Sequence, residues 1–535
     1  MSAVRALARR RLALPAPRSG VVASCEWVAM ADGARLATFV ARPRDGAGAT
    51  LLVRGSQDVL SARRPLPVVA ALLAEQGVAV ALQECRGLRA SEGVFTPFVH
   101  EARDGADAIR WLSTQPWFAS PLALGGIGYG GYAAFAALAG SPQPVERLVV
   151  GYAARDPYAW LHAGGALQLE ATLSLALALG GAERGASTAR SLARALYHRP
   201  VCEADRVGFR RLDWLREWLE HPARDAFWES LVAPLPARPP HALLIGSWNH
   251  AALPAQLADH AALAAAAERA RTGGAALEIG AAPGTSRRHA ARQVEESLRA
   301  ALRFLIGGRD ARHAPVRVFD GGAARWRESA QWPPARVSPR TLHLRGDGSA
   351  QGSDGDGRLE LEPPGAFEPP DRFVYDPADA TPSDDSRSQR GDVLCYASAP
   401  LPAPLGVAGA LRAELHVASD APATDFCARV VAVAADGSES LLGEGIARVA
   451  AAPGPGAAAS RRIAIDCGSA CWRLASGSRL RLEIASASHP CFDRHPDTLE
   501  EPVRADADAG VPARQTLFHN AAHPSALVIE TTGES

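Results

Sequence analysis

Short apolar runs alternate with amphipathic stretches through the first 310 residues. Apolar runs of this length predict buried β-strands, and the amphipathic stretches predict helices with one buried face. The predicted strands are 50–53, 78–82, 122–124, 148–150, 242–245 and 276–279, and the predicted helices lie around 67–76, over 101–113 and from 132 onward. A hairpin over 24–43 is predicted to turn at Asp32-Gly33, a favourable turn dipeptide. This alternation predicts a parallel sheet covered on both faces.

Residues 156–236 interrupt the strand series with a mostly helical, tryptophan-rich pattern. The tryptophans of this stretch are Trp160, Trp214, Trp218 and Trp228. Because the stretch falls between two predicted strands of one sheet, we expect it to form a helical cap over the carboxyl edge of that sheet.

The pattern changes again after residue 310. Residues 346–385 are dense in Gly, Asp, Ser and Pro, which predicts loops. Farther on, residues 411–417, 428–433 and 480–484 alternate with a period of two, which is typical of an antiparallel sandwich. The sequence therefore predicts three parts: an α/β domain over 1–155 and 237–310, a cap over 156–236, and a β-sandwich over 311–535.

The composition excludes several classes of function. The 535 residues carry 57 basic and 57 acidic side chains, and every basic one is arginine. A balanced charge without basic clusters excludes a nucleic-acid-binding footprint, and the lack of lysine excludes Schiff-base chemistry. A chain of this length exceeds one ordinary core, which agrees with several domains.

Neither a targeting segment nor a membrane span is predicted. Residues 1–11 are basic but lack an apolar core, and no run of about 18 apolar residues occurs. The eight cysteines form no C-x-x-C pair, so they are interpreted as small buried residues rather than metal ligands. We therefore expect a cytoplasmic protein without a metal or cofactor.

The segment Leu124–Tyr132 lies between a predicted strand and an alanine-rich helix. It reads Leu-Gly-Gly-Ile-Gly-Tyr-Gly-Gly-Tyr. This setting is typical of a nucleophile elbow, the sharp strand-to-helix turn that exposes a serine in α/β-hydrolases. The central position is Gly128, however. Glycine adopts the strained backbone conformation of such a turn at little cost, so the sequence predicts the turn without its nucleophile.

Several segments, in order along the chain, resemble the CocE/NonD (cocaine esterase / X-Pro dipeptidyl-peptidase) hydrolase family. They are Gln83-Glu-Cys-Arg86-Gly87 with Ser91-Glu-Gly93, the helix 101–112 followed by Gln115-Pro116-Trp117, and Arg390-Gly-Asp392, Thr424-Asp425-Phe426 and His523-Pro524-Ser525 in the C-terminal part. The resemblance covers nearly the whole chain. It implies an α/β-hydrolase fold with a helical cap and a C-terminal all-β, jelly-roll-like sandwich, and descent from hydrolases that cleave acyl esters or amides through a serine acyl-enzyme.

The same resemblance implies four functional positions, and each holds a different residue here. Gly128 stands at the position of the serine and His250 at that of the acid. Gly284 stands at the position of the histidine and Gln57 at that of an oxyanion-hole tyrosine. Tyr129 keeps the backbone N–H that would donate to an oxyanion, and the Gln57 amide can donate as well. We therefore predict a pseudoenzyme that binds a small-molecule or peptide ligand under the cap, and the resemblance is compatible with a homo-oligomer.

An active ester or amide hydrolase, or an acyltransferase, with relocated residues is the main alternative. Its candidate residues lie near the ends of predicted strands: Ser56, Ser247, His250 and His289. Active sites of open α/β sheets gather at such strand ends. Ser56 or Ser247 could serve as nucleophile and His250 as base, with Asp58 or Asp259 orienting the imidazole. His289, five residues past the expected histidine position, is a further candidate base.

Nucleotide binding is a minor alternative. Residues 126–131 fit the pattern G-x-G-x-x-G after a strand and before a helix, as in dinucleotide-binding units. Such a unit requires an acidic residue at the end of the next strand, and Leu148–Tyr152 supplies none. Two strand–helix units also precede the motif, which suits a hydrolase elbow better.

Two further groups of charged residues are interpreted structurally. Asp104 and Asp107 lie three residues apart on one helix face, and a salt-linked helix surface explains such a pair more commonly than paired catalytic carboxylates. Arg86 is expected to brace the sheet edge through hydrogen bonds.

A histidine-rich loop near the C-terminus has the composition of a metal site. His489, Asp493 and His495 fall within seven residues. The loop is also similar to a sandwich loop of the family, so we assign no metal to it.

Overall fold

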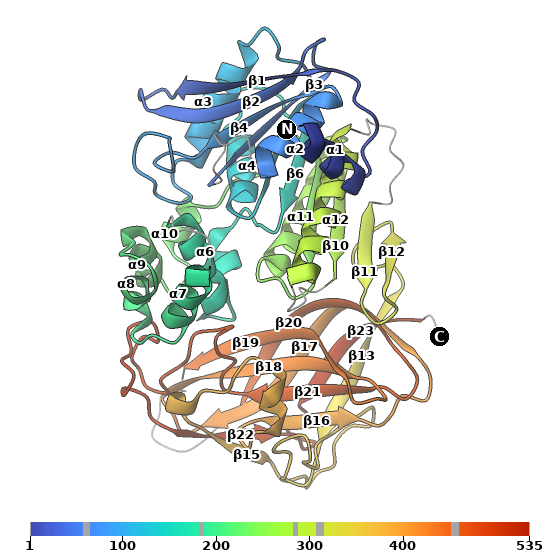
Figure 1. The fold of residues 1–535 in the computed structure, drawn as a ribbon. Coiled ribbons are helices and arrows are strands. Elements are labelled where there is room, and N and C mark those ends of the chain that lie inside the picture. The colour runs from blue at the N-terminus through green and yellow to red at the C-terminus, as the bar shows by residue number, and fades with distance from the viewer. Residues whose placement is uncertain are drawn as a thin grey trace. The chain divides into compact units, whose positions relative to one another are not determined.

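The computed structural model describes residues 2–56, 65–180, 186–281, 287–306, 315–450 and 460–533. The chain divides into two compact units (Figure 1). The first comprises Met1–Trp160, Asp225–Val318 and Glu328–Ala330, and the second comprises Leu161–Arg224, Phe319–Arg327 and Gln331–Ser535.

A mostly parallel sheet forms the centre of the first unit. Its strands are β1 (Val21–Ala29), β2 (Arg35–Pro43), β3 (Ala49–Gly55), β4 (Val78–Glu84), β5 (Leu122–Ile127), β6 (Arg147–Gly151), β9 (His241–Ser247), β10 (Ala275–Gly280) and β11 (Val316–Asp320). They follow the order β1-β2-β4-β3-β5-β6-β9-β10-β11, and β12 (Arg325–Ser329) completes this sheet beside β11. β1 and β2 pair antiparallel, as do β2 and β4, and the pairs from β4 through β11 are parallel. The predicted hairpin and parallel sheet are confirmed.

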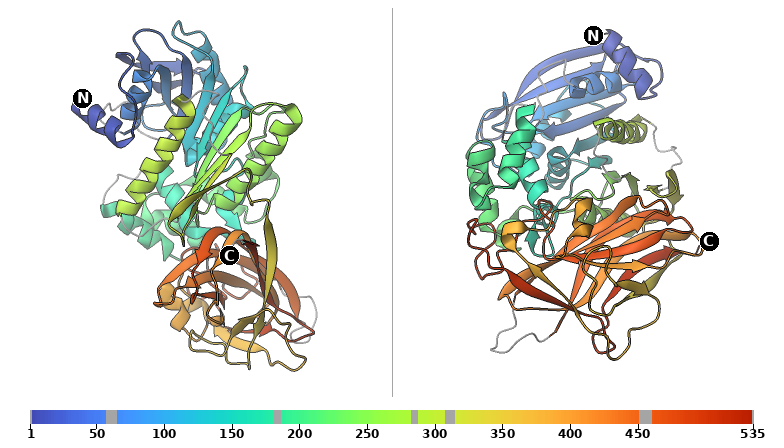
Figure 2. Two further views of the ribbon diagram at one scale, coloured as in Figure 1. Left: turned by 90° about the vertical axis from the view of Figure 1, so that its right-hand side faces the viewer. Right: turned by 60° about the horizontal axis from the view of Figure 1, so that its bottom comes forward.

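Helices cover both faces of this sheet (Figure 2). The helices of this unit are α1 (Ser2–Arg11), α2 (Pro65–Glu75), α3 (Glu101–Ser113), α4 (Tyr129–Ala139), α5 (Pro157–Leu161), α10 (Ala226–Ser230), α11 (Leu253–Ala270) and α12 (Arg287–Ile306), and α5 extends one residue into the second unit. Leu72 of α2 and Leu302 of α12 are buried in one core cluster with Leu51, Val80 and Leu243 of the sheet. α4 contacts β5 and β6, and α11 contacts β9 and β10. α3 packs against α4.

The helix after the elbow starts earlier than predicted. We expected it from residue 132, whereas α4 begins at Tyr129. The turn at Gly128 reverses the chain within one residue, so no linker separates β5 from the helix. Composition alone could not show this, because the first helical residues are two glycines and two tyrosines, which have low helix propensity.

The helical stretch between β6 and β9 lies mostly in the second unit. Its elements there are β7 (His162–Ala163), β8 (Ala166–Leu167), α6 (Leu169–Leu179), α7 (Ala186–Leu196), the short helix η1 (Val201–Glu203), α8 (Ala204–Gly208) and α9 (Asp213–Glu220). The predicted helical character is confirmed, with β7 and β8 as a small unpredicted hairpin. The hairpin is tied to the β-sheet of its own unit, because the N–H of Arg448 donates to the carbonyl of Gly164 at 2.8 Å.

The rest of the second unit is an all-β domain, as predicted. Its strands are β13 (Val337–Arg345), β14 (Arg358–Glu360), β15 (Asp371–Tyr375), β16 (Leu394–Ser398), β17 (Leu405–Ser419), β18 (Ala423–Val433), β19 (Glu439–Ala450), β20 (Arg461–Leu474), β21 (Arg479–Ala485), β22 (Ala513–Phe518) and β23 (Ala526–Thr532), with short helices η2 (Pro377–Asp379) and η3 (Asp385–Gln389). Their pairing is antiparallel except between β14 and β16.

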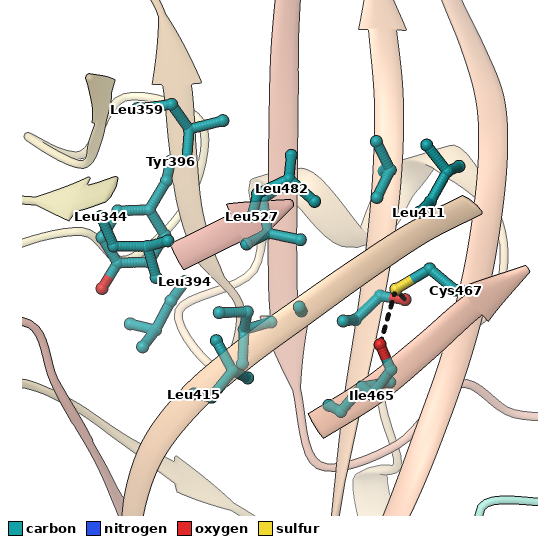
Figure 3. Close-up of a cluster of buried hydrophobic side chains, with 14 of the residues drawn as sticks. Leu344, Leu359, Leu394, Tyr396, Leu411, Leu415, Ile465, Cys467, Leu482 and Leu527 are labelled. Atoms are coloured by element: carbon teal, nitrogen blue, oxygen red, sulfur yellow. Dashed lines mark hydrogen bonds between the residues drawn. The ribbon is translucent and has the colours of Figure 1, made fainter. Parts of the chain in front are cut away.

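A large apolar core holds this β-domain together, with smaller clusters beside it. It takes side chains from strands far apart in the sheet order, such as Leu344 of β13, Leu415 of β17 and Leu482 of β21 (Figure 3). Alternate residues of β17 are buried, among them Leu411 and Leu415. This is the period-two pattern on which the prediction rested.

Candidate functional site

The strand-to-helix turn at Gly128 has the backbone of a nucleophile elbow. Gly128 separates β5 from α4 and has φ 58° and ψ −129°. Its N–H donates to the carbonyl of Gly151 on the neighbouring strand β6 at 2.8 Å, and its carbonyl accepts from the N–H of Gly131 at 2.8 Å. A non-glycine residue is strained in this region of backbone space. The turn is therefore built, and hydrogen-bonded on both sides, around a position that has no side chain.

Packing requires glycine on either side of the turn but not at its centre. A Cβ at Gly126 would lie 2.1 Å from the carbonyl oxygen of Gly130, and one at Gly130 would lie 2.8 Å from that of Arg54. A Cβ at Gly128 would meet no heavy atom of the described residues within 4 Å. The space for a larger side chain at the centre of the elbow is thus present.

Tyr129, directly after the turn, is held rigidly. Its hydroxyl accepts from the N–H of Phe98 at 3.0 Å and donates to Glu101 Oε1 at 2.7 Å. Burial raises the pKa of the Tyr129 phenol well above its usual range, so the group is neutral. Within the described part of the chain, no acceptor receives the backbone N–H of Tyr129. This N–H, at the start of α4, is the donor that would face a developing oxyanion.

A buried network of ion pairs and hydrogen bonds holds Glu101, the residue that binds the Tyr129 hydroxyl. Arg54, at the end of β3, donates through Nη1 to Glu101 Oε2 at 2.8 Å and through Nε to Gln83 Oε1 at 2.8 Å. Asp104 lies 3.7 Å from Arg54 and accepts from Arg86 at 2.7 Å. The side chains of Arg54 and Glu101 are 1% and 2% exposed. The Tyr129 hydroxyl is therefore bound to an ion pair that is almost completely removed from water.

The interpretation of Asp104 and Asp107 as salt-linked is confirmed, since Asp104 pairs with Arg86 and Asp107 with Arg110. Their placement on the helix surface was wrong, because both residues are buried. Asp104 pairs with Arg86, which also reaches Asp32 at 2.9 Å, as expected for a residue that braces the sheet edge. Asp107 accepts from the N–H of Ala31 at 2.8 Å. The face of α3 that carries these carboxylates packs on the β1–β2 turn, and Ala31 of the turn, Arg86 and Arg110 supply their donors.

His250, which we expected at the position of the family's acid, follows β9 and is half-buried. Its Nδ1 accepts from the N–H of Ala252 at 3.2 Å, and its ring lies edge-on to Tyr152 at 5.2 Å. Burial lowers the pKa of His250 to about 4, so the ring is neutral near pH 7. Because Nδ1 accepts a hydrogen bond, this neutral ring carries its proton on Nε2. Neither nitrogen is then available to take a proton from a serine.

The serines proposed as relocated nucleophiles are not joined to this histidine. Ser247 is fully buried, and its hydroxyl has no hydrogen-bond partner among the described residues. Ser56 follows β3 and is half-buried; in the described part of the chain neither hydroxyl bonds to His250. Asp259, proposed to orient the imidazole, instead binds Arg155 at 3.0 Å. Burial raises the pKa of Asp259 to about 7, against the opposing effect of Arg155.

Four of the residues named from the sequence cannot be placed in this site. Gln57, Asp58 and Gly284 lie outside the described residues, as does the side chain of His289 on α12. Cys85, which also follows a strand, is fully buried beside Glu101, and burial raises the pKa of its thiol well above the usual range. It therefore stays protonated and is a poor nucleophile.

The protonation of His250 predicts a pH dependence of stability. Its folded pKa of about 4 lies below the value of about 6.5 in an unfolded chain. The unfolded chain then binds more protons between these values, so this contribution is fully present above pH 6.5 and is lost as the pH falls toward 4. The wild type should therefore lose free energy of unfolding of the first unit as the pH falls from 7 to 4. We expect this loss to be about 1–3 kcal/mol smaller in the His250→Asn variant. Urea unfolding between pH 4 and 7 measures it, and parallel curves for the two proteins would contradict the assignment.

Metal ligation finds no support in the described residues. Among them, no group of three or more His, Cys, Asp and Glu side chains is placed to hold a metal ion. In the histidine-rich loop, Asp493 binds Arg448 at 3.1 Å, and His495 Nδ1 accepts from the N–H of Asp497 at 3.0 Å. Within the same described ranges, no helix is both long and apolar enough to cross a bilayer.

Two family models and one curated protein match the sequence of this chain. Residues 32–267 match the model of the X-Pro dipeptidyl-peptidase (S15 family), and residues 310–528 match that of the X-Pro dipeptidyl-peptidase C-terminal non-catalytic domain. The chain is also similar to the cocaine esterase of Rhodococcus sp. (strain MB1 Bresler), with 29% identity over 575 residues, which cover 95% of this chain and 98% of that protein.

Solved structures share the fold over nearly the whole chain. An aminopeptidase from a marine sediment archaeon, Thaumarchaeota archaeon, has a TM-score of 0.77 at 19% identity and covers 96% of this chain and 97% of its own. An α-amino acid ester hydrolase has a TM-score of 0.77 at 20% identity, with 97% and 98% covered. A CocE/NonD family hydrolase from Staphylococcus aureus has a TM-score of 0.68 at 13% identity, with 96% and 97% covered.

Proposed function

This chain belongs to the CocE/NonD (cocaine esterase / X-Pro dipeptidyl-peptidase) hydrolase family, and we propose that it is a pseudoenzyme of that family, which binds a carbonyl or carboxylate ligand without cleaving it. The observation that carries the proposal is Gly128, a residue without a side chain at the centre of a complete nucleophile elbow.

Serine-hydrolase chemistry needs a nucleophile, a base that takes its proton, and a carboxylate that orients the base. Gly128 supplies no nucleophile. His250, at the acid position, is a neutral ring whose Nδ1 is already used by Ala252. In subtilisin, the loss of the nucleophile or base costs about 10⁶ in kcat and leaves a residual ~10³–10⁴ over water. An inherited pocket in this state would bind substrate-like molecules far better than it would convert them.

Ligand binding is supported by the donor that remains. The N–H of Tyr129 has no acceptor among the described residues, and it stands at the N-terminus of α4, where the helix dipole favours negative charge. The side chain of Tyr129 fixes its backbone through Phe98 and Glu101. A carbonyl or carboxylate oxygen beside Gly128 would accept this hydrogen bond.

The alternative of relocated catalytic residues has weaker support. It requires Ser56 or Ser247 to pass a proton to His250. In the described residues no hydrogen bond joins either hydroxyl to that ring, and the ring's proton lies on Nε2. Nucleotide binding has less support still, because β6 ends at Gly151 without an acidic residue.

A fluorophosphonate probe and p-nitrophenyl esters test the proposal. We expect the wild-type protein to remain unlabelled and to show no burst of p-nitrophenol. The triple variant Gly128→Ser, His250→Asp, Gly284→His should regain labelling at residue 128 and esterase turnover, because it restores the three side chains that the family resemblance implies. The double variant His250→Asp, Gly284→His is the matched control and should stay inactive. Labelling of the wild type at Ser56 or Ser247, with a burst, would replace the pseudoenzyme by the relocated enzyme.

A further inference from the structure

Three nitrogen-bearing side chains lie in the second unit, whereas the elbow belongs to the first. Arg199 follows α7, and His489 and Arg494 lie in the loop after β21. Arg199 donates through Nη2 to the carbonyl of Arg494 at 2.8 Å and through Nη1 to that of Pro502 at 2.8 Å. These bonds hold the helical segment and the loop side by side. We call Arg199, His489 and Arg494 the cationic cluster.

Among the residues that the structure describes, neither arginine of the cationic cluster has a carboxylate partner. Arg494 is half-buried, and its guanidinium forms no hydrogen bond or ion pair with any described residue; its Nε is buried as well as unpartnered. Arg199 is also half-buried, and within the described ranges its side chain bonds to the two main-chain carbonyls alone. A guanidinium carries five N–H donors, so the remaining donors of the pair, apart from the buried Arg494 Nε, are open to solvent or to a ligand.

His489 adds a buried imidazole whose nitrogens also lack good hydrogen bonds within the described residues. It is 5% exposed, and neither ring nitrogen makes a hydrogen bond of good geometry within the described residues, although the main chain of Phe492 lies close enough to favour the protonated ring. Buried polar atoms are nearly always hydrogen-bonded, so two nitrogens without good hydrogen bonds on one ring require an explanation. The ring of Tyr197 packs edge-on against His489 at 4.9 Å and is 65% exposed. The cationic cluster therefore reaches the surface beside Tyr197.

The electrostatics of the cluster are unfavourable without a ligand. Burial, and then repulsion from Arg494, lower the pKa of Arg199 to about 10. Burial, followed by Arg494 and Arg199, lowers the pKa of His489 to about 3. Asp493 is the nearby acid that opposes this effect on Arg199, but it already binds Arg448 at 3.1 Å. Desolvated positive charge without a counterion is costly to a fold.

We propose that the cationic cluster is a binding site for a phosphate-type oxyanion, either free phosphate or the phosphate group of an ester. Two guanidinium groups match the charge of a dianion, and their fork geometry suits phosphate oxygens. His489, neutral at pH 7, can add one N–H donor. The ligand supplies the counter-charge that Arg199 and Arg494 lack in the folded chain. This site is independent of the elbow and of the proposed pseudoenzyme function.

Calorimetric titration of the full chain in chloride buffer tests the site with inorganic phosphate, phenyl phosphate and acetate. We expect saturable binding of one phosphate or phenyl phosphate per chain, at least tenfold tighter than any binding of acetate. Tighter binding of phenyl phosphate than of phosphate would identify an ester as the ligand, and the reverse would identify the free anion. Arg494→Gln should weaken phosphate binding at least tenfold. Arg514→Gln removes an exposed arginine of β22 in the same unit and should leave binding unchanged.

Thermal unfolding separates a ligand site from a structural role. Phosphate should raise the melting temperature of the wild type, and Arg494→Gln should abolish that rise while melting no lower than the wild type in phosphate-free buffer. A structural arginine would lower the melting temperature equally in both buffers. His489→Asn serves as a second variant if Arg494→Gln does not fold. No saturable phosphate binding, preference for acetate, or an unchanged phosphate response in the variant would overturn the proposal.

Discussion

Replacing Arg54 with methionine is expected to destabilise the first unit by about 3–5 kcal/mol. The guanidinium is almost completely buried and binds Glu101 at 2.8 Å. Removing it leaves the carboxylates of Glu101 and Asp104 in a dry environment with fewer donors. The loss of one partner of a buried ion pair is costly for this reason, even where replacement of both partners by apolar residues is tolerated. Glu101 also anchors Tyr129, so the elbow should loosen as well.

Urea unfolding of the first unit measures this effect, and Arg103→Met is its matched control. Arg103 lies on the same helix as Glu101, but it is 56% exposed and pairs with the partly exposed Asp32 at 3.1 Å. Exposed pairs contribute about 0–1 kcal/mol, so the control should remain close to the wild type. Equal losses for the two variants would mean that the network beneath the elbow does not carry the stability assigned to it here.

The order of strands and helices could be predicted because it depends on local patterns. Apolar runs located the strands of the first unit, and α3 occupies the predicted residues 101–113. The burial of Asp104 could not be predicted in the same way. The sequence of a helix does not show whether a carboxylate on one of its faces is exposed to water or paired with a residue from another element. Asp104 is paired with Arg86, and this contact exists only when the chain after β4 and α3 are packed together. One signal was available, since Arg54 interrupts the end of an otherwise apolar strand.

The candidate site could be predicted in its position but not in its chemistry. The glycine-rich segment located the elbow at Gly128, because the residues that form a sharp turn are adjacent in sequence. The state of His250 depends on a hydrogen bond from Ala252 and on burial, which only the folded chain defines. The cationic cluster joins Arg199 to Arg494, nearly 300 positions apart in sequence. No local pattern could indicate that these arginines lack carboxylates.

Gly126→Ala should cost at least about 4 kcal/mol, which is in the range of severe backbone or packing defects, whereas Gly128→Ala and Gly128→Ser should cost only about 1–3 kcal/mol. A Cβ at residue 126 would lie 2.1 Å from the carbonyl oxygen of Gly130, and main chain cannot move aside as a flexible side chain can. At residue 128 the space is open, and the cost comes from the φ of 58° alone.

Urea unfolding of the three variants measures this difference, and it bears directly on the pseudoenzyme proposal. If Gly128→Ser folds at the modest expected cost, then packing did not force the serine out of the turn, and the inherited elbow can still accept a nucleophile. Relief of backbone strain is then a sufficient physical gain from glycine once catalysis is no longer needed. If Gly128→Ser instead costs as much as Gly126→Ala, the turn has been rebuilt around glycine. Restored side chains would then fail to restore activity, and the pocket could not be regarded as an inherited hydrolase site.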